Sequence, residues 1–569
     1  MIRFLFLLTT LTSVAAYGQV PFERIVNAGH EPQNWLTYSG NYAGHRYSEL
    51  SEIDRKSVAS LKVAWAVQMP SSRTETTPIA IDGILYITAP NMVSAIDGKT
   101  GRSLWTWTRP LPPKFRMNGF VAVNRGAAVL DDTLYVGALD GVLIALDLKS
   151  GSERWRAPVA DWHAGFAITS APIAAAGKVV IGVSGGEAGV RGFLDAYDAK
   201  TGKRAWRFYT VPAPGEPGNE TWANDSWKTG GGTTWTPGSF DPETGILFWG
   251  VGNPGPDWNG DGRKGDNLYT CSLLALDLAS GKLRWHFQFT PHDTHDWDSA
   301  HVPLLINGRI NGAERKLVAV ANRNAFYYVL DRSTGGFISA TAYARQTWND
   351  GFEANGRPVV RPQSEPTEQG QLVAPDFNGA TVWPSPSYSP QTHLVYVPAR
   401  DSAAVYFKRD TPYVEGTYFM GGTYGSLTYP EHKSAIRALD ASTGKMAWEF
   451  TLLTPPWSGV LSTAGNLVFS GSSEGLFYAL DAQTGELLWN IHLGCEITAN
   501  PMAYAIDGHE YLVIAADRVL YAFDLPKTGN ALARFSRGIR RSVLLHAGNT
   551  RKERGQLTLS ESPRADRGS

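Results

Sequence analysis

The chain has 569 residues, a formal net charge of −1 and 18% charged residues, a balance that argues against a nucleic-acid partner. Its 59 Gly, 34 Pro, 19 Trp and 23 Tyr favour a turn-rich, aromatic-rich β protein over a helical one. The only cysteines are Cys271 and Cys495, which excludes a disulfide scaffold, a Cys-x-x-Cys zinc site and a Cys-x-x-Cys-His haem attachment site. Whether these two cysteines pair with each other is left open.

Residues 1–18 have the features of a signal peptide. Arg3 precedes an apolar run that ends at Val14, and the small residues Ala16 and Gly18 suit cleavage before Gln19. The apolar run is too short to span a bilayer. We therefore expect an exported, soluble chain, which in a bacterium is periplasmic; an uncleaved anchor is the alternative.

A repeated pattern, Asp-x-x-[Thr/Ser]-Gly-x-x-x-Trp, dominates the middle of the chain. In most copies an apolar pair precedes the Asp, so each copy predicts a strand, a tight turn with Gly at positive φ, and a second strand. The copies begin at Asp97, Asp147, Asp198, Asp241, Asp277, Asp440 and Asp481, with a degenerate copy at Asp331. Repeated hairpins predict an all-β, eight-bladed β-propeller within residues 19–526, in which each repeat Trp packs between neighbouring blades.

Two further motifs are rejected because the residues around them do not fit the corresponding sites. Gly250–Gly255 fits the dinucleotide pattern G-x-G-x-x-G, but Pro256 and "DWNGDG" follow it instead of the required helix. The segment that starts at Asp257 begins like a calcium loop, yet Leu268 stands where a bidentate Glu belongs. A solvated turn is the preferred interpretation of this segment.

Polar side chains lie in segments between the predicted hairpins, and the loops at one end of a propeller converge on its axis. Glu187, Asn253, Asp296 and Asp298 offer hard oxygen ligands, which suit calcium or a similar ion and not zinc or copper. Asp296 and Asp298 stand two apart, so on a strand both carboxylates would face the same side and require a positive group between them. The sequence therefore predicts a cation site that these loops share.

Several motifs in the same order resemble the family of pyrroloquinoline-quinone (PQQ)-dependent alcohol dehydrogenases, soluble eight-bladed quinoproteins that include methanol dehydrogenase. The resemblance covers about residues 30–525 and rests on "NRG" at Asn124–Gly126, "SGGE" at Ser184–Glu187, "GGGTTW" at Gly230–Trp235, "GVGNP" at Gly250–Pro254, "TPHDTHDWD" at Thr290–Asp298 and "NRN" at Asn322–Asn324. Each motif alone is weak, and together they are specific.

The resemblance implies a role for each matching residue. Glu187, Asn253 and Asp296 would hold a metal ion against the quinone, and Asp298 is a further metal ligand in lanthanide-dependent relatives, where calcium-type relatives have a small uncharged residue. Asp296 would also be the general base, with Arg323 beside the reactive carbonyl. The remaining positions that match the family's cofactor site are Glu75, Arg125, Thr169, Ser184, Gly185, Gly186, Thr233, Trp235 and Trp457.

The mechanism implied by this resemblance is the oxidation of a primary alcohol to an aldehyde. The metal would act as a Lewis acid on the quinone, Asp296 would take the alcohol proton, and hydride would pass to the quinone. Since the chain has no haem motif, a separate cytochrome c is the expected electron acceptor, and a homodimer is left open. A trivalent lanthanide fits the clustered carboxylates better than calcium, unless Asp298 instead caps a turn or pairs with a nearby His or Arg.

The chain also departs from the family. The two adjacent cysteines of methanol dehydrogenases are replaced by Gly119 and Phe120, and Val382 and Trp383 stand where some relatives have Asn-Trp. A quinoprotein that has lost its activity is therefore one alternative. Another is a non-catalytic periplasmic scaffold for protein assembly, because such propellers show similar hairpins.

The repeat pattern stops after Pro526. Residues 527–569 carry ten Lys or Arg and three Asp or Glu, so we expect a basic, disordered tail. A docking arm for an acidic partner is the alternative interpretation.

Overall fold

The computed structural model describes residues 19–70, 73–117, 122–427 and 432–526. The predicted signal peptide, Gly119, Phe120 and the basic tail lie outside these described residues, so the expectations for them stay predictions. The chain divides into two compact units, Met1–Leu525 and Pro526–Ser569, and all described strands belong to the first.

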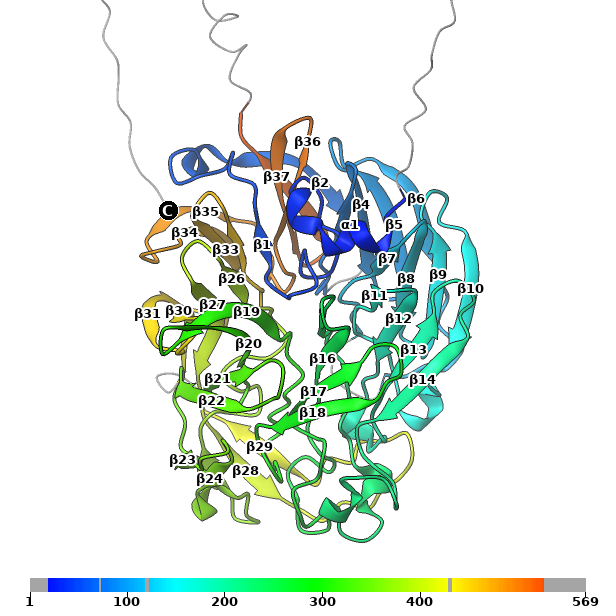
Figure 1. Ribbon diagram of the computed structural model, residues 1–569, viewed down its shortest axis with the longest axis vertical. Helices are drawn as coiled ribbons and strands as arrows, with labels where there is room; N and C mark the ends of the chain where they lie inside the picture. Colours follow the sequence, from blue (N-terminus) through cyan, green and yellow to red (C-terminus); the bar gives the residue numbers. More distant parts are fainter. Residues whose placement is uncertain (1–18, 71–72, 118–121, 428–431, 527–569) are drawn as a thin grey trace, which may run out of the picture. The chain divides into compact units, whose positions relative to one another are not determined.

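Antiparallel sheets follow one another along the chain in this first unit (Figure 1). Five four-stranded sheets use consecutive strands: β3 (Ile79–Ile81), β4 (Ile84–Ala89), β5 (Met92–Asp97) and β6 (Ser103–Thr108); β7 (Ala128–Leu130), β8 (Thr133–Ala138), β9 (Val142–Asp147) and β10 (Glu153–Pro158); β11 (Ile173–Ala175), β12 (Lys178–Gly182), β13 (Phe193–Asp198) and β14 (Arg204–Tyr209); β15 (Ser239–Asp241), β16 (Ile246–Gly250), β17 (Ser272–Asp277) and β18 (Leu283–Gln288); β19 (Leu304–Ile310), β20 (Ala313–Ala321), β21 (Phe326–Asp331) and β22 (Phe337–Ala342).

The next part of the chain interrupts this regular order. A further four-stranded sheet joins β26 (Ser387–Ser389), β27 (Leu394–Asp401), β30 (Lys433–Asp440) and β31 (Met446–Leu452). Around it the chain adds a pair and a three-stranded sheet: β23 (Asn349–Phe352) with β24 (Pro358–Val360), and β25 (Gln371–Val373), β28 (Ala404–Lys408) and β29 (Gly422–Ser426).

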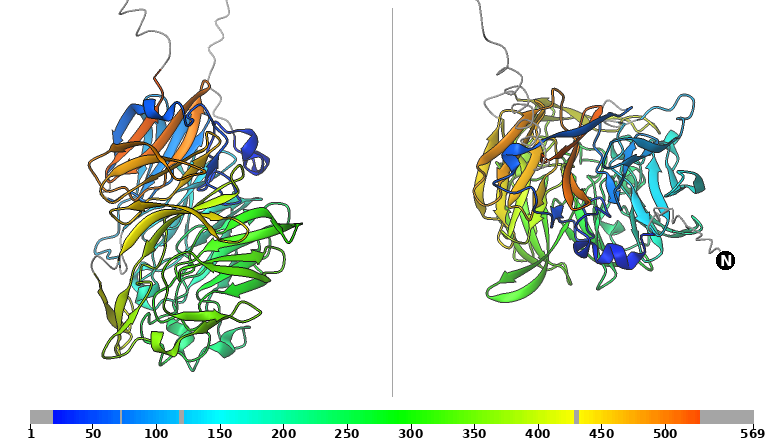
Figure 2. Two further views of the ribbon diagram at one scale, coloured as in Figure 1. Left: turned by 90° about the vertical axis from the view of Figure 1, so that its left-hand side faces the viewer. Right: turned by 90° about the horizontal axis from the view of Figure 1, so that it is seen from above.

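Two sheets combine strands from both ends of the unit. The pair formed by β1 (Tyr47–Ser48) and β32 (Leu461–Thr463) is parallel and extends β33 (Leu467–Gly471), β34 (Leu476–Asp481) and β35 (Leu487–His492). The strand β2 (Lys62–Gln68) is antiparallel to β38 (Val519–Asp524) and completes the sheet of β36 (Met502–Ile506) and β37 (His509–Ala516). In Figures 1 and 2 the blue β2 accordingly lies beside these orange strands.

The helices of the described residues are all short. They are α1 (Phe22–Val26) and the 3-10 helices η1 (Ala28–His30), η2 (Val58–Ser60), η3 (Trp162–Ala164), η4 (Gly186–Ala188), η5 (Asn219–Thr221), η6 (Ser226–Thr229) and η7 (Pro362–Ser364). Among the described residues we find no helix with the length and apolar character needed to cross a membrane. The predicted all-β class is therefore confirmed.

The repeated motif forms the turn between the last two strands of a sheet and also joins that sheet to its neighbour. The Asp147 carboxylate accepts hydrogen bonds from the backbone N–H groups of Lys149 and Ser150, and Gly151 follows with φ of 70°. A Cβ atom on Gly151 would lie only 2.4 Å from the ring of Trp105, the Trp of the preceding repeat. The same Trp-on-Gly contact pairs Trp155 with Gly202, Trp206 with Gly281, Trp285 with Gly335 and Trp448 with Gly485. The prediction that these Trp residues pack between sheets is confirmed.

One copy of the motif does not follow this arrangement. The Asp241 copy forms the hairpin between β15 and β16, the first two strands of its sheet, and a Cβ on Gly245 would meet no atom within 4 Å. Trp206 instead packs on Gly281, the glycine of the Asp277 copy. The reading of Asp241 as a repeat equivalent to the others is therefore wrong, although the predicted hairpin does form.

Candidate active site

Loops from several sheets enclose a cavity of about 340 Å³, which lies within the size range of small-molecule sites. Most of the predicted site residues line it: Glu75, Arg125, Thr169, Ser184, Gly185, Glu187, Thr233, Trp235, Asp296, Asp298, Arg323 and Trp457. Gly186 and Asn253 are buried just behind this wall, where a Cβ on Gly186 would lie 3.8 Å from the Asn253 side-chain oxygen. The structure therefore brings together the residues that the sequence analysis selected.

The positive group between the two aspartates is the guanidinium of Arg323. Its Nη2 donates to Asp296 Oδ2 over 3.2 Å, and its Nη1 donates to Asp298 Oδ2 over 2.5 Å. All three side chains are buried. Thr290–His301 forms no strand, so the strand geometry considered for this pair is wrong; Asp296 instead takes a left-handed conformation with φ of 61°.

Asp298 has further partners on both carboxylate oxygens. Oδ1 accepts the backbone N–H of Asn253 at 2.8 Å, and Oδ2 also accepts Trp235 Nε1–H at 3.2 Å. The alternative in which Asp298 pairs with an Arg is thus present in the structure. Because each carboxylate oxygen has more than one lone pair, these bonds leave acceptor capacity for a cation.

His301 supports Arg323 from behind. Its Nε2 accepts the backbone N–H of Arg323 at 3.0 Å, which leaves Nδ1–H to donate to the carbonyl oxygen of Val382, also at 3.0 Å. Burial, together with the charge of Arg323, lowers the pKa of His301 to about 3. A neutral His301 therefore fixes the strand-connecting loop that carries Arg323, a role that the sequence analysis did not find.

A fourth carboxylate, Asp257, belongs to the same cluster and was also missed. Asp257 is 1% exposed, and its Oδ1 accepts a hydrogen bond from Asn253 Nδ2 at 2.9 Å. The interpretation of its segment as a solvated turn is wrong for this residue. Its position four residues after Asn253, across two prolines, was the signal available in the sequence.

Burial and mutual repulsion disfavour negative charge on these carboxyl groups in the protein alone. Burial raises the pKa of Glu187 to about 7, with a further increase from Asp298 and an opposing effect of Arg323. Burial likewise raises the pKa of Asp257, and the charge of Glu187 raises it further. Burial also raises the pKa of Asp296, whereas the charge of Arg323 lowers it. A multivalent cation would remove this repulsion, and carboxylate and amide oxygens are suitable donors for it.

The described residues do not contain three His, Cys, Asp or Glu side chains that already converge as a metal site. The predicted ligand set of Glu187, Asn253, Asp296 and Asp298 includes an amide and therefore stays a prediction. Its support lies in the donor chemistry and in the excess of carboxylates over guanidinium groups.

Charged and aromatic side chains line the part of the cavity away from the carboxylates. Arg125 lies with its guanidinium carbon 4.8 Å from the ring centroid of Trp235, and its Nη2 is 2.7 Å from Glu75 Oε2. Arg73 approaches the other oxygen of Glu75 at 3.1 Å. Glu75 thus holds the guanidinium groups of Arg73 and Arg125 at the cavity wall.

A stack of side chains forms another wall. The rings of Trp383 and Trp457 lie parallel, with centroids 5.0 Å apart and an interplanar angle of 7°. Arg73 lies 5.3 Å from the centroid of Trp383, and Arg400 lies 4.4 Å from that of Trp457. Lining residues that the sequence analysis did not select are Arg73, Met117, Val123, Phe377, Asn378 and Tyr424. None of these residues belongs to a family motif, although Val123 directly precedes the motif at Asn124–Gly126.

Three buried hydrogen-bond donors on cavity-lining side chains lack a partner within the described structure. They are Nε of Arg125, Nε of Arg323 and Nε1 of Trp383. Two of these three side chains, Arg125 and Arg323, carry a guanidinium group and line the cavity, so the cavity suits a ligand with several anionic oxygens. A quinone that bears three carboxylates satisfies this requirement, and the residues present therefore fit PQQ.

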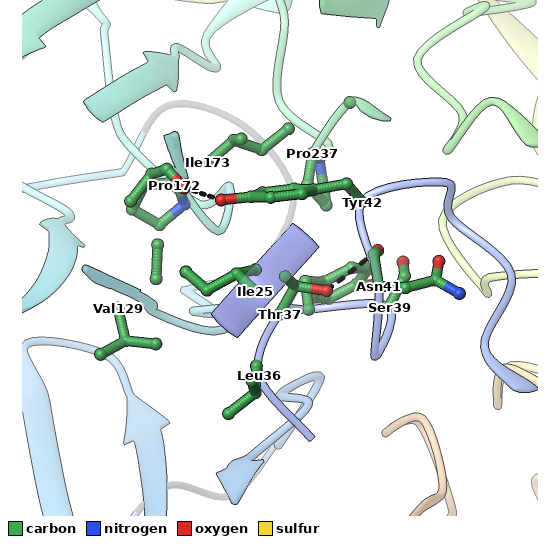
Figure 3. A pocket seen from close by; sticks show the side chains of 14 residues that line it. Ile25, Leu36, Thr37, Ser39, Asn41, Tyr42, Val129, Pro172, Ile173 and Pro237 are labelled. Carbon is green, nitrogen blue, oxygen red and sulfur yellow. Dashed lines mark hydrogen bonds between the residues drawn. The ribbon is translucent and has the colours of Figure 1, made fainter. Parts of the chain in front are cut away.

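A second cavity, at the N-terminal segment, does not share these properties (Figure 3). It holds only about 30 Å³ and is lined by apolar groups such as Ile25, Leu36 and Ile173. Tyr42 reaches across it and donates from its hydroxyl to the carbonyl oxygen of Ala174 at 2.6 Å. This volume suits a water molecule and not a cofactor.

Comparison with known proteins identifies the family. The family profile described as "Glucose/ethanol/alcohol dehydrogenase, beta-propeller domain" matches residues 35–345, more than half of the chain. The quinoprotein alcohol dehydrogenase PedH of Pseudomonas putida is 35% identical over 536 residues, which cover 89% of this chain and 90% of that protein. The chain belongs to the PQQ-dependent alcohol dehydrogenases.

Other members of this dehydrogenase family show the same extent of similarity. A lanthanide-dependent methanol dehydrogenase of Methylacidiphilum fumariolicum (strain SolV) is 35% identical over 88% of this chain and 89% of its own. The solved structure titled "Europium-containing methanol dehydrogenase" superposes with a TM-score of 0.84 and 32% identity over 88% of this chain and 100% of that chain. The predicted family and enzyme class are therefore confirmed.

A second profile, described as "Outer membrane protein assembly factor BamB", matches residues 432–557. This region contains the hairpin repeats at Asp440 and Asp481. Among the predicted site residues it includes only Trp457, so this match covers repeats of the dehydrogenase and one residue of its cavity wall.

Proposed function

We propose that this enzyme oxidises a primary alcohol to the aldehyde with PQQ and one metal ion bound in the 340 Å³ cavity. The observation that carries the proposal is the position of Arg323, which holds Asp296 and Asp298 in a cavity that Arg125 and Trp235 also line. A base, a cation site and an anion site thus occupy one enclosed volume.

The metal ion would be held by Glu187, Asn253, Asp296 and Asp298. When bound, the metal and the quinone together supply an electrophilic carbonyl that accepts hydride from the alcohol carbon. We propose a lanthanide as the preferred ion, with calcium as the alternative, because Asp257 adds a fourth carboxylate to the cluster. Among the described residues, Arg323 is the cation in direct contact with these carboxylates.

Asp296 is proposed as the general base. Its carboxylate faces the cavity, and its left-handed backbone and the bond from Arg323 hold it in one orientation. Taking the alcohol hydroxyl proton while hydride leaves the same substrate gives the aldehyde without charge accumulation on the product. Phe377 and Tyr424, whose ring centroids are 3.9 Å apart, form an aromatic part of the cavity wall.

PQQ would lie on the ring of Trp235 with its carboxylates toward Arg125 and Arg323. Thr169, Ser184 and Thr233 would bond its polar edge, Gly185 and Gly186 would allow its close approach, and Glu75 would hold Arg125 in place. Trp457 would contribute through its stack on Trp383. Asn378 offers an amide in the same cavity, which reduces the expected consequence of Val382 in place of an Asn.

We propose that the eight sheets of four or more strands are the eight blades of a closed propeller within residues 19–526. The pairing of β2 with β38 supports this closure. Residues 1–18 are proposed as a signal peptide and residues 527–569 as a basic tail. The enzyme would then work in the periplasm and pass electrons to a separate cytochrome c, since the sequence has no haem attachment motif.

The competing scaffold function has one observation in its favour, the match to the assembly-factor profile at residues 432–557. A scaffold has no use for the carboxylates and Arg323 inside the cavity, which lie outside that match. Burying such groups costs stability, and a catalytic site explains why they are retained.

The proposed function predicts that purified, full-length protein binds PQQ only when a metal ion is present. Titration of PQQ should quench tryptophan fluorescence with lanthanum or calcium and leave it unchanged in a chelator. Glu187→Gln should weaken this metal-dependent binding, whereas the exposed Glu486→Gln should behave as the wild type. Equal PQQ binding with and without metal would contradict the shared site.

A further inference from the structure

We infer that Asp257 is a positioning residue, which holds the side-chain amide of Asn253 with its oxygen toward the metal ion. The inference rests on the proposed function, because Asn253 is a metal ligand only there. It assigns a role to a segment that otherwise resembles an incomplete calcium loop.

The hydrogen bonds of Asn253 define which end of its amide faces which way. Nδ2 donates to Asp257 Oδ1 at 2.9 Å and lies 3.4 Å from the carbonyl oxygen of Pro254. Both acceptors are on the nitrogen side, so the amide oxygen points the other way. There it lies close to Gly186, the residue before Glu187, as the 3.8 Å approach of a Cβ on Gly186 indicates.

A carboxylate enforces this orientation more strictly than an amide would. With a cation bound beside it, Asp257 is favoured as an ionised carboxylate, which only accepts hydrogen bonds, so turning Asn253 by 180° would place two oxygens against each other. An asparagine at position 257 has both a donor and an acceptor end. It could satisfy Asn253 in either orientation, and the preference for an oxygen at the metal would be lost.

The neighbours of Asp257 keep it in position. The backbone N–H of Trp258 donates to the carbonyl oxygen of Met420 at 3.0 Å, and Nη2 of Arg263 donates to the carbonyl oxygen of Pro256 at 3.0 Å. Asp257 itself is 1% exposed, and its Oδ2 is buried without a hydrogen-bond partner among the described residues. A buried carboxylate oxygen requires a partner, and the hydrogen bond that Asp257 does accept comes from the amide of Asn253.

Side chains that orient metal ligands typically change metal affinity about 10–100-fold when they are replaced. We therefore expect Asp257→Asn, which keeps the shape of the side chain, to weaken lanthanide binding about tenfold. Asp257→Ala removes the acceptor and should weaken it at least as much. Asp261→Asn is the matched control, because it removes the same charge from the same loop at a side chain that is 56% exposed.

The experiment uses full-length protein freed of metal and titrated with europium(III), with and without PQQ. Europium luminescence gives the dissociation constant, and its lifetimes in H₂O and D₂O report how many water molecules coordinate the ion. A water should replace the amide oxygen in Asp257→Asn and shorten the lifetime in H₂O. A role in folding alone would not change the water count of the bound ion.

The inference is supported if Asp257→Asn binds europium about tenfold more weakly and gains coordinated water while Asp261→Asn resembles the wild type. It is overturned if Asp257→Asn has the affinity and lifetime of the wild type, or if Asp261→Asn loses affinity equally. If Asp257→Ala does not fold, Asp257→Asn decides. A wild-type protein that binds neither europium nor PQQ would instead contradict the proposed function, which separates the two failures.

Discussion

Glu510 offers a test of the packing between the two ends of the chain. It lies in β37, is 1% exposed, and accepts the backbone N–H of Ile53 through Oε2 at 2.9 Å. Burial raises its pKa from 4.5 to about 7, and the neighbouring charge of Glu52 adds to this. The folded protein therefore binds a proton at Glu510 under conditions in which the unfolded chain has released it.

The sign and size of the effect follow from these two pKa values. Between pH 4.5 and 7 the folded state holds more protons at this residue, so its contribution to the free energy of unfolding falls as the pH rises. At roughly 1.4 kcal/mol per pH unit, the contribution of Glu510 to the free energy of unfolding falls by about 3 kcal/mol over this pH range. Glu510→Gln keeps an oxygen for Ile53 and has no charge to bury. Its unfolding free energy relative to the wild type should therefore rise by about 3 kcal/mol from pH 4 to pH 8.

Urea unfolding of wild type and Glu510→Gln at a series of pH values measures this difference. Glu486→Gln, at an exposed position, is the control and should show no such pH dependence relative to the wild type. A constant difference between Glu510→Gln and wild type from pH 4 to pH 8 would show that Glu510 does not hold a proton in the folded state with a raised pKa. So would a larger advantage for Glu510→Gln at the acidic end.

Three predictions concern the active site. Asp296→Asn should abolish alcohol oxidation with a dye acceptor and leave the far-UV circular dichroism unchanged; near-normal turnover would show that another group is the base. Arg125→Ala should weaken PQQ binding by about 1.5–3 kcal/mol, the range for a hydrogen bond to a charged group, and an unchanged titration curve would count against this contact. Asp298→Ala should lose the lanthanide-supported rate, and retention of that rate would remove Asp298 from the metal site.

The fold was largely predictable because each copy of the repeat contains both the turn residues of a hairpin and the Trp that packs on the neighbouring sheet. The terminal Trp of one copy packs on the turn Gly of the next copy, as Trp105 does on Gly151. A local sequence pattern therefore encodes a contact between neighbouring sheets. The Asp241 copy was wrongly predicted to be equivalent to the others because a hairpin turn needs the same residues wherever it stands in a sheet. Only the partners of its Gly, which are long-range contacts, distinguish the two positions.

Most of the predicted site residues stand in ordered motifs, whereas those that were missed act through contacts with other residues of the site. Asp257 and His301 orient Asn253 and Arg323 by single hydrogen bonds. Trp383 enters the cavity wall through its stack on Trp457, which lies more than 70 residues away. Apart from the four-residue spacing of Asn253 and Asp257, no spacing in the sequence records these relations, because they depend on how the loops converge.

The proposed activity is tested most directly by reconstitution of full-length, metal-free protein with PQQ and either lanthanum or calcium, followed by assay of primary-alcohol oxidation with a dye acceptor. We expect aldehyde formation that requires both PQQ and metal and that is faster with lanthanum than with calcium. Absence of alcohol oxidation under every combination, with PQQ and metal shown to be bound, would contradict it.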